Sequence, residues 1–378
     1  MTINNLYILA SFKSLGVTNQ VIQGLEGLGI FKPTGIQVQS IPKLIRSPID
    51  FIGLAQTGTG KTAAYSIPII QNIDFTKPKI QALILCPTRE LGKQIAKQIF
   101  KLTKYTEKIF VEAVYGGEKI ETQISSLRRK THILVATPGR LLDLRRRKAV
   151  DLRQLKIVVL DEADEMLSIG FKKDLDLILE QTSRASNTWM FSATMPKEIT
   201  QIINNYMDPD AVKVEVNRGQ QVNPDISHQY AICEQAQKME ALVFFLKSHK
   251  KERGIIFCKT KRATKQLHDQ LTEKNYQVGC IHGDLKQIER NKVMRAFKGD
   301  KLKVLIATDI SARGIDIDNL AYVFHYQLPD QVEYYTHRSG RTARKGKRGV
   351  SILLVAPKEV KQMRLISKQL HIEFKQLQ

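Results

Sequence analysis

Residues 51–62 read FIGLAQTGTGKT, an apolar run followed by a glycine-rich segment that ends in Gly60, Lys61 and Thr62. The run Phe51–Leu54 has the length and composition of a strand that is buried on both faces of a parallel sheet. Glycines between such a strand and a helix let backbone N–H groups approach phosphate oxygens, and the helix N-terminus favours negative charge. The stretch therefore predicts an α/β unit with a phosphate-binding loop.

The loop carries the side chains that phosphate chemistry needs. Gly58 and Gly60 stand where the phosphate-loop pattern requires glycine, whereas Ala55 replaces the glycine of the first position. Lys61 is placed to reach the β- and γ-phosphates of a nucleotide, and the Thr62 hydroxyl is placed to help bind Mg²⁺. The alternative is an ordinary glycine turn before a helix.

Further apolar runs follow on both sides of the middle of the chain, separated by stretches of helical length. Alternating strands and helices predict an α/β fold with right-handed crossovers, in the form of two successive open parallel sheets. The runs of the first half are Phe51–Leu54, Ala82–Cys86, Ile133–Ala136, Ile157–Leu160 and Trp189–Phe191. Those of the second half are Gly254–Cys258, Val278–Ile281, Val304–Ala307, Val323–Tyr326 and Ile352–Val355.

The boundary between the two halves lies in a polar stretch that contains Pro209, Gly219 and Pro224. Proline and glycine favour a linker over the interior of a helix or strand. In open α/β sheets, ligands bind beyond the carboxyl ends of the strands, so two such domains predict a cleft between them. The predicted division is a first domain over 1–206, a linker over 207–224 and a second domain over 225–378.

The composition is that of a globular protein with an excess of positive charge. The 378 residues include 59 Lys and Arg against 37 Asp and Glu, a net charge of +22. Divided after Tyr206, the two parts carry +10 (28 minus 18) and +12 (31 minus 19). Because both parts are basic, we expect a polyanion such as a nucleic acid to contact both; charge that merely solvates the surface is the alternative.

Other classes of protein are disfavoured by the composition. No run approaches the roughly 18 apolar residues that a membrane span needs, and residues 1–12 lack the pattern of a signal peptide. The cysteines form no CxxC pair, which disfavours a zinc site and a disulfide framework; a reducing compartment, and hence a cytoplasmic location, is expected. The cysteines are Cys86, Cys233, Cys258 and Cys280.

A pair of acids, Asp161 and Glu162, ends the apolar run that begins at Ile157. An acid in this position of a phosphate-loop enzyme binds Mg²⁺ beside the γ-phosphate, which is the role expected of Asp161. Glu162 is the candidate for orienting or deprotonating the attacking water. Alone, such a pair can equally be a helix N-cap; a phosphate loop in the same domain favours the catalytic interpretation.

The segment Asp161-Glu162-Ala163-Asp164, after a phosphate loop, resembles the DEAD-box family of ATP-dependent RNA helicases (superfamily 2). The core as a whole is most similar to that of bacterial members with a minimal core. Further family motifs follow in the expected order from about Phe12 to about Gly349. Ser339 and Ala343 differ from the residues that are most common at these positions of the family. The matching stretches are Pro87–Leu91, Gly116–Gly117, Thr137–Arg140, Ser192–Thr194, Ile255–Thr260, Gln287–Arg290, Ala307–Asp316 and His337–Arg344. The resemblance implies two tandem RecA-like domains.

Upstream of the phosphate loop, Gly29–Gln37 resembles the Q motif of the family. The resemblance implies that Gln37 reads the adenine edge, since an amide can both donate and accept a hydrogen bond, as adenine requires. Phe12 occupies the place of the isolated upstream aromatic. Ile30 replaces the usual aromatic residue and Gly35 replaces a frequent proline.

The resemblance implies a site divided between the two domains, with ATP and Mg²⁺ as ligands. Arg341 and Arg344 would act as arginine fingers that reach the γ-phosphate when the cleft closes. The implied catalytic residues are Lys61, Asp161, Glu162, Arg341 and Arg344. The implied ATP-binding residues are Phe12, Gln37, Ala55, Gln56, Thr57, Gly58, Thr59, Gly60, Lys61, Thr62, Gly314 and Asp316, and Thr62 and Asp161 would bind Mg²⁺. Those implied to couple the two domains are Asp164, Ser192, Thr194 and His337.

The implied RNA-binding residues lack an aromatic stacking platform. We therefore expect recognition of the sugar-phosphate backbone with little base specificity, and contacts to 2′-hydroxyls that select RNA over DNA. The run Arg145–Arg147 either touches a phosphate or forms a solvated helix face. The implied RNA-binding residues are Pro87, Thr88, Arg89, Gly117, Thr137, Arg140, Thr260, Arg290, Thr308 and Arg313.

The sequence thus predicts an ATP-dependent RNA helicase that locally unwinds short RNA duplexes, with RNA-stimulated ATP hydrolysis at the cleft. One alternative is a DNA helicase or translocase of the same superfamily, which the Q motif and the sequence Asp-Glu-Ala-Asp at 161–164 disfavour. The other is a nucleotide-dependent RNA clamp whose slow hydrolysis only times release; the filled catalytic positions disfavour it. Comparing the ATPase rates with RNA and with DNA would distinguish the RNA helicase from the first alternative. Nucleotide-dependent retention of RNA with negligible ATP turnover would identify the second.

Overall fold

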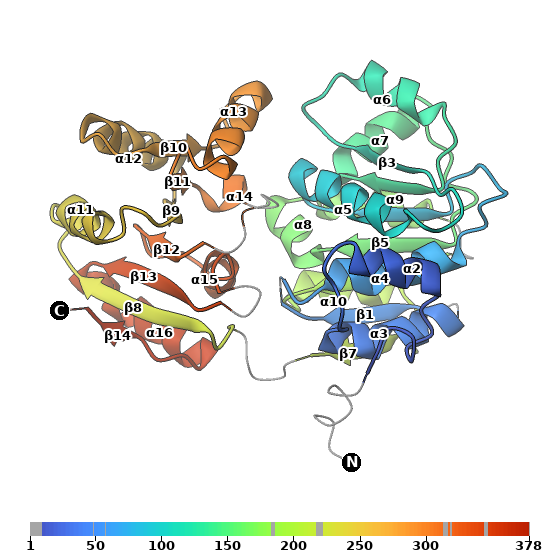
Figure 1. Ribbon diagram of the computed structural model, residues 1–378, viewed down its shortest axis with the longest axis horizontal. Coiled ribbons are helices and arrows are strands. Elements are labelled where there is room, and N and C mark those ends of the chain that lie inside the picture. Colours follow the sequence, from blue (N-terminus) through green and yellow to red (C-terminus); the bar gives the residue numbers. More distant parts are fainter. Residues whose placement is uncertain are drawn as a thin grey trace, which may run out of the picture. The chain divides into compact units, whose positions relative to one another are not determined.

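The computed structural model shows two compact units, Met1–Val216 and Asn217–Gln378, and each is described by itself (Figure 1). In each unit, helices cover both faces of a parallel sheet, as the alternation of apolar runs predicted. The residues that the structure describes are 10–47, 49–56, 58–182, 186–216, 222–312, 317, 320–343 and 347–377.

The sheet of the first unit has the strand order β3-β4-β2-β5-β6-β1-β7, and every pair of neighbours is parallel. Parallel strands bring all their carboxyl ends to one edge of the sheet, where ligands bind in folds of this class. The strands are β1 (Phe51–Leu54), β2 (Ala82–Leu85), β3 (Val111–Val114), β4 (Ile133–Ala136), β5 (Ile157–Asp161), β6 (Asn187–Ser192) and β7 (Val212–Glu215).

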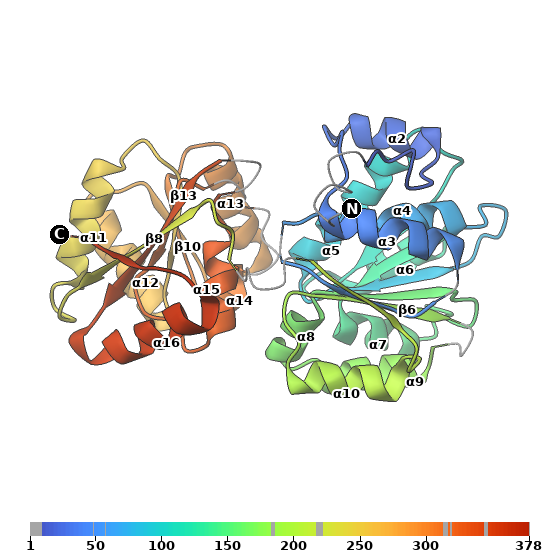
Figure 2. The ribbon, with the colours of Figure 1, turned by 90° about the horizontal axis from the view of Figure 1, so that it is seen from below.

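Alternate residues of the central strands face two separate cores. In β2, Ile84 packs into one core whereas Leu83 and Leu85 pack into the other, because successive side chains of a strand point to opposite faces. Figure 2 shows the two helix layers on either side of this sheet. One layer consists of α2 (Asn19–Glu26), α3 (Gly35–Arg46), α4 (Lys61–Asn72) and α5 (Arg89–Leu102). The other contains α7 (Pro138–Arg146), α8 (Ala163–Ile169), α9 (Lys172–Glu180) and α10 (Lys197–Tyr206), and α6 (Ile120–Leu127) packs on the same core.

The second unit repeats this architecture with the strand order β10-β11-β9-β12-β13-β8-β14, again parallel throughout. The strands are β8 (Ile226–Ile232), β9 (Gly254–Phe257), β10 (Val278–Ile281), β11 (Val304–Ala307), β12 (Tyr322–His325), β13 (Gly349–Val355) and β14 (Lys375–Gln376). One face carries α11 (Lys238–Ser248) and α12 (Lys261–Glu273). The other carries α13 (Gln287–Lys298), α14 (Asp309–Ala312), α15 (Val332–Ser339) and α16 (Val360–Leu370), which follows the short 3₁₀ helix Pro357–Glu359.

All ten apolar runs of the sequence form strands, with ends that differ by at most a few residues. The additional strands β3, β7 and β14 lie at sheet edges, and β8 lies next to one. The strand β7 falls within the stretch 207–224, where a linker was expected, and it pairs with β1. The first unit therefore continues to Val216, beyond the expected end at residue 206.

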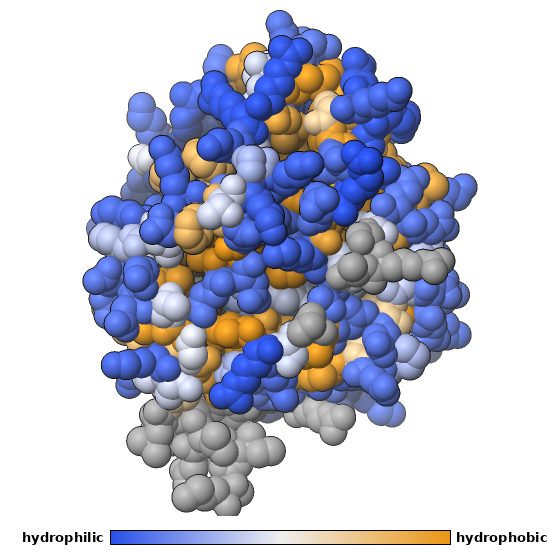
Figure 3. Space-filling view, turned by 90° about the vertical axis from the view of Figure 1, so that its right-hand side faces the viewer, coloured by the Kyte–Doolittle hydropathy of each residue, from blue (hydrophilic) through white to orange (hydrophobic). Residues whose placement is uncertain are grey.

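Hydrophilic side chains dominate the face of the first unit drawn in Figure 3, and apolar side chains are interspersed among them. Some large apolar residues of this unit are exposed, which is ordinary for a folded domain. They are Phe31, Phe75, Phe100, Tyr105 and Leu177. Within the ranges that the structure describes, no helix combines the length and the apolar character needed to cross a membrane.

Candidate active site

The strand order of the first unit separates two sets of predicted residues along one sheet edge. The neighbouring strands β5, β6 and β1 end in the acidic pair, in Ser192 and in the phosphate loop. The other half of the sheet, β2, β4 and β3, ends in the residues expected to bind RNA. After the residues predicted on them, these two stretches of the edge are called the nucleotide half and the nucleic-acid half.

The phosphate loop has the backbone that its glycines allow. Gly58 and Gly60 have φ angles of +84° and +90°, a left-handed conformation that other residues adopt only with strain. Gly60 is the N-cap of α4, so Lys61 and Thr62 begin that helix, and Lys61 is buried. At the other end of the loop, the Ala55 N–H donates to the Ser192 carbonyl at 3.0 Å, which ties the loop to β6.

Gln37 packs directly against this loop. Its Oε1 accepts from the Thr34 N–H at 2.9 Å, and its Nε2 donates to the Gly60 carbonyl at 3.0 Å. A Cβ on Gly60 would lie 2.4 Å from the Gln37 Nε2, so only glycine permits this approach. The amide has two donors and two acceptor sites, of which one of each is used here. One donor and one acceptor therefore remain for the edge of a base.

Phe12, also predicted to belong to the nucleotide site, lies in the core of the first unit with only 4% of its surface exposed. It begins the segment that leads into α2, where its carbonyl accepts from the N–H groups of Leu15 and Val17. Its contribution to nucleotide binding stays a prediction.

The acidic pair at the end of β5 has one buried and one partly exposed member. Asp161 is 2% exposed, and its Oδ1 accepts from the Glu162 N–H at 3.0 Å. Glu162 has a φ angle of +52° at the start of α8, a left-handed conformation that is unfavourable for a residue with a Cβ. Backbone strain of this kind clusters at functional sites, where the surrounding structure enforces it.

Tyr65, which the sequence did not single out, completes this part of the site. Its hydroxyl donates to the Asp161 Oδ2 at 2.8 Å. Burial, followed by the charge of Asp161, raises the pKa of Tyr65 well above its ordinary value, so the phenol keeps its proton. Burial also raises the pKa of Asp161, and the positive charge of Lys61 acts against that shift.

The donor set suits Mg²⁺, which prefers oxygen ligands and takes one or two from the protein and others from phosphates and water. Thr62 and Asp161 supply a hydroxyl and a carboxylate beside the phosphate loop. Burial disfavours the charged form of Asp161, and a cation bound beside it would stabilise that form.

Three of the four predicted coupling residues form one hydrogen-bonded cluster. The Asp164 Oδ2 accepts from the Thr194 N–H at 2.9 Å and from its hydroxyl at 2.8 Å. The Ser192 Oγ accepts from the Asp164 N–H at 3.3 Å and donates to the Thr194 carbonyl at 2.7 Å. The segment after β6 is thus tied to the start of α8, beside the acidic pair.

In the nucleic-acid half, predicted threonines stand at the N-termini of helices. Thr88 and Thr137 precede α5 and α7, and in the second unit Thr260 precedes α12. The hydroxyls of Thr88 and Thr260 accept from the N–H groups of Leu91 and Ala263, as helix caps do. Helix N-termini also attract phosphate, so capping and backbone recognition are compatible at these positions.

Two arginines of this half each contact a residue that the sequence did not identify, Tyr115 for Arg89 and Gln123 for Arg140. Arg89 lies over the Tyr115 ring and donates to the Gly117 carbonyl at 3.1 Å. Arg140 donates to the Gln123 Oε1 at 2.7 Å.

Gln123 is only 3% exposed, and its Nε2 donates to the Tyr115 carbonyl at 3.1 Å and to the Glu118 carboxylate at 3.0 Å. Gln123 thereby links Arg140 of α7 to the segment 115–118, which contacts Arg89. Arg146, by contrast, forms an exposed pair with Asp143, which favours the solvated-face interpretation of the run 145–147.

In the second unit, the Arg290 Nη2 donates to the Ser311 carbonyl at 2.7 Å, and the Thr308 and Ser311 hydroxyls are 2.9 Å apart.

Pro87, which was predicted to bind RNA, follows β2 of the first unit and is buried. Arg341 and His337 lie on or just after α15, and their approach to a nucleotide stays a prediction. Thr57, Arg313, Gly314, Asp316 and Arg344 lie outside the described residues.

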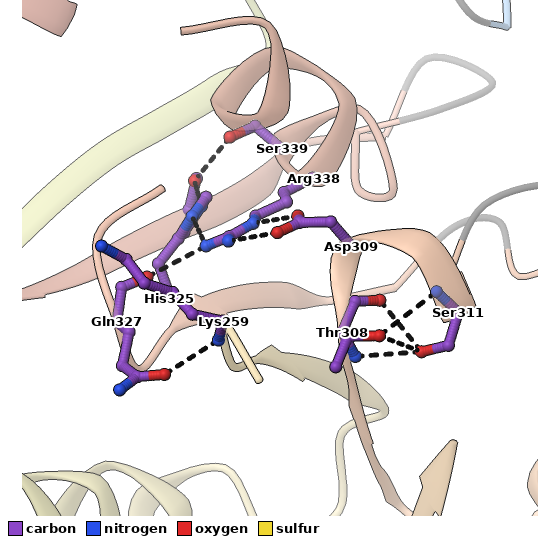
Figure 4. A network of polar contacts seen from close by, with 9 residues as sticks. Lys259, Thr308, Asp309, Ser311, His325, Gln327, Arg338 and Ser339 are labelled. Atoms are coloured by element: carbon purple, nitrogen blue, oxygen red, sulfur yellow. Dashed lines mark hydrogen bonds and ion pairs between the residues drawn. The ribbon is translucent and has the colours of Figure 1, made fainter. Parts of the chain in front are cut away.

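A buried polar network runs through the second unit (Figure 4). The Arg338 guanidinium, 1% exposed, binds both carboxylate oxygens of Asp309 at 2.5 and 2.7 Å and donates to the Gln327 carbonyl at 3.0 Å. His325 Nε2 lies 3.0 Å from the Ser351 hydroxyl. The network continues through Tyr335 to His228, and it connects the Asp309 and Arg338 segments to the core of the sheet.

This network predicts an acid-sensitive second unit. Burial lowers the pKa of His228 to about 4, so between pH 6.5 and 5 the unfolded chain binds a proton there that the folded chain does not. Stability therefore falls as the pH falls, by about 1–2 kcal/mol from this histidine over that range. Urea unfolding at pH 7 and pH 5 measures the loss. His228→Gln should reduce the loss, whereas a change of the partly exposed His268 to Gln should leave it unaltered.

Comparisons with known proteins agree with this geometry. The DEAD/DEAH box helicase family matches residues 34–202, and the helicase conserved C-terminal domain matches residues 237–346. The DEAD-box ATP-dependent RNA helicase CshA of Bacillus cereus is 38% identical over 361 residues, which cover 95% of this chain and 68% of the relative. The ATP-dependent RNA helicase CshA of Limosilactobacillus reuteri is 40% identical over 359 residues, 94% of this chain and 71% of the relative.

Among solved structures, Dbp5 of S. cerevisiae bound to RNA and ADP BeF3 matches with a TM-score of 0.89 at 32% identity, covering 97% of this chain and 95% of that one. Both halves of the chain thus match helicase family models in sequence, and nearly the whole chain matches a helicase in fold. The chain belongs to the DEAD-box family of ATP-dependent RNA helicases.

Proposed function

We propose that this protein is an ATP-dependent RNA helicase that hydrolyses ATP in an RNA-stimulated reaction and locally separates short RNA duplexes. The observation that carries the proposal is that the residues predicted to bind nucleotide and those predicted to bind RNA lie on separate halves of one sheet edge. Because both halves belong to one unit, RNA and ATP would bind the same rigid element, and each can influence the other through it.

The hydrolytic step relies on positioning and charge stabilisation. Lys61 and the N–H groups at the start of α4 would hold the phosphates, and Gln37 would read adenine with the donor and acceptor that remain free. Bound by Thr62 and Asp161, Mg²⁺ would neutralise charge on the phosphate oxygens. Glu162 would orient the attacking water and accept its proton.

The second unit would complete this site. In the proposed closed state, Arg341 and Arg344 approach the γ-phosphate, and Asp316 and Gly314 contact the nucleotide, while RNA lies across both units. The Asp164–Ser192–Thr194 cluster would transmit the closure, since it joins β6 to the start of α8 beside Glu162. Hydrolysis would then require RNA and ATP together.

Threonines at helix N-termini and fixed arginines support RNA binding through the sugar-phosphate backbone, with little base specificity. Strand separation tests the function directly. A short RNA duplex should be separated when ATP is added, and a DNA duplex of the same sequence should not. Separation of both duplexes would favour the DNA-helicase alternative. RNA retained in the presence of ATP, with neither separation nor turnover, would identify a clamp.

The Gln37 geometry predicts preference for ATP over GTP. Guanine presents the reversed hydrogen-bond pattern at the edge that the amide would read, which leaves a buried polar group unpaired at a cost of about 1–3 kcal/mol. Hydrolysis rates with each nucleotide should therefore differ at least roughly fivefold at low concentration. Gln37→Glu removes the donor while keeping the shape and should lower ATP use. Equal rates with ATP and GTP would contradict the assignment of Gln37.

We also propose a cytoplasmic location. It is supported by the four free thiols, three of them buried, which suit a reducing compartment.

A further inference from the structure

The Tyr65 hydroxyl lies at the centre of the candidate site, and none of the steps above uses it. It is carried by α4, the helix that begins at Lys61. Residues three and four positions apart share one face of a helix, so Thr62 and Lys61 lie on the same side of α4 as Tyr65. One helix thus presents an ammonium group, a hydroxyl and a phenol toward the end of β5.

The position of the phenol is fixed by packing. Tyr65 is 0% exposed, and its ring lies 5.3 Å from the ring of Phe191 on β6, centroid to centroid. Phe191 in turn packs against Phe51 of β1 at 5.6 Å. A tyrosine whose ring packs against β6 and whose hydroxyl is bonded to the end of β5 holds that hydroxyl in one place, unlike a long flexible side chain.

The hydroxyl determines how the Asp161 carboxylate is oriented. The Oδ1 accepts from the Glu162 N–H at 3.0 Å and the Oδ2 from the Tyr65 hydroxyl at 2.8 Å. An ionised carboxylate has about four acceptor sites, so a site remains on each oxygen. Two hydrogen bonds from different elements, a strand end and a helix, fix the plane of the carboxylate. Without the phenol, the Glu162 N–H would be the one remaining hydrogen-bond donor to this carboxylate among the described residues.

We infer that Tyr65 is a positioning residue for the Mg²⁺ site: it holds the Asp161 carboxylate in the orientation in which the metal binds. The inference rests on the proposed function, in which Asp161 is a metal ligand. A carboxylate that is already oriented needs no reordering when the ion arrives, so the hydroxyl should strengthen Mg²⁺ binding rather than compete with it.

The test uses Tyr65→Phe, which keeps the ring packing and removes one oxygen atom. Binding of a fluorescent ATP analogue to the intact chain is titrated with MgCl₂. The Mg²⁺ concentration for half-maximal enhancement of binding should rise about three- to tenfold, the loss expected when one hydrogen bond of typical net strength no longer orients the carboxylate. Binding of the analogue in EDTA should be unchanged. This readout is independent of turnover.

Tyr335→Phe is the matched control. Tyr335 is also fully buried, and its hydroxyl lies 2.5 Å from the His228 Nδ1 in the second unit. The same atom is removed from a comparable environment, so stability should fall without a change in Mg²⁺ dependence. If Tyr65→Phe folds poorly, Tyr65→Met, which also lacks the hydroxyl, should show the same or a larger shift.

The outcomes separate this inference from the proposed function. An unchanged or lower Mg²⁺ requirement in both Tyr65 variants, with normal Mg²⁺-dependent binding by the parent, would overturn the positioning role alone. If the parent binds the analogue with no Mg²⁺ dependence and shows no RNA-stimulated hydrolysis, the proposed function fails, and the inference fails with it.

Discussion

Glu162→Gln should retain ATP binding and lose nearly all turnover. The change keeps the size of the side chain and leaves the phosphate loop, Lys61 and the Asp161 hydrogen bonds intact. It removes the carboxylate that would orient the attacking water and accept its proton, and a positioned acid or base typically contributes about 10²–10⁴-fold to a rate. RNA-stimulated phosphate release, measured at saturating ATP, should fall by that factor.

The matched control is Glu198→Gln, which removes an exposed carboxylate from the first turn of α10. It should hydrolyse ATP at the parental rate. If Glu162→Gln keeps most of the RNA-stimulated rate, Glu162 is not the water-orienting residue, and the strained backbone at this position needs another explanation.

Arg338→Met should destabilise the second unit by about 3–5 kcal/mol, because removal of one partner of a buried ion pair leaves the other without compensation. Asp309 would lose both guanidinium contacts, and the Gln327 carbonyl would lose a donor. Lys303→Met, which breaks the exposed pair of Lys303 with Asp300, should change stability by less than about 1 kcal/mol.

The chain offers a convenient probe for this test. Its one tryptophan, Trp189, lies on β6 of the first unit, so fluorescence reports that unit, whereas circular dichroism reports both. In Arg338→Met, urea unfolding by circular dichroism should show a new early transition, and the Trp189 transition should stay in place. Coincident transitions at the parental midpoint would show that the Arg338–Asp309 pair is not needed for stability.

Central strands were predictable because both their faces are buried. Runs such as Ile133–Ala136 and Val304–Ala307 contain apolar residues alone, and the structure places them inside the sheets. Edge strands pack on fewer neighbours and can alternate apolar and polar residues, as Val212–Glu215 does with the sequence VKVE. Such a short alternating pattern did not outweigh the nearby prolines and glycine, which favour a linker. The first domain was therefore predicted to end at residue 206, before this strand.

The site was predictable where its residues are adjacent in sequence and unpredictable where they meet only in the fold. The phosphate loop and the acidic pair are continuous motifs, and the structure brings them together because β1, β6 and β5 are neighbours. Tyr65 and Asp161 are 96 positions apart, and Gln123 and Arg140 are 17 apart. Such hydrogen bonds depend on helix rotation and strand order, which a motif does not encode.

The rate of ATP hydrolysis with and without RNA tests the central claim most directly. The intact chain would be assayed with saturating ATP and Mg²⁺, alone, with single-stranded RNA, and with DNA of the same sequence. We expect a low rate for the protein alone, a rate many times higher with RNA, and little effect of DNA, since contacts to 2′-hydroxyls distinguish the two. A rate that is the same with and without RNA would contradict the coupling between the nucleotide half and the nucleic-acid half of the site.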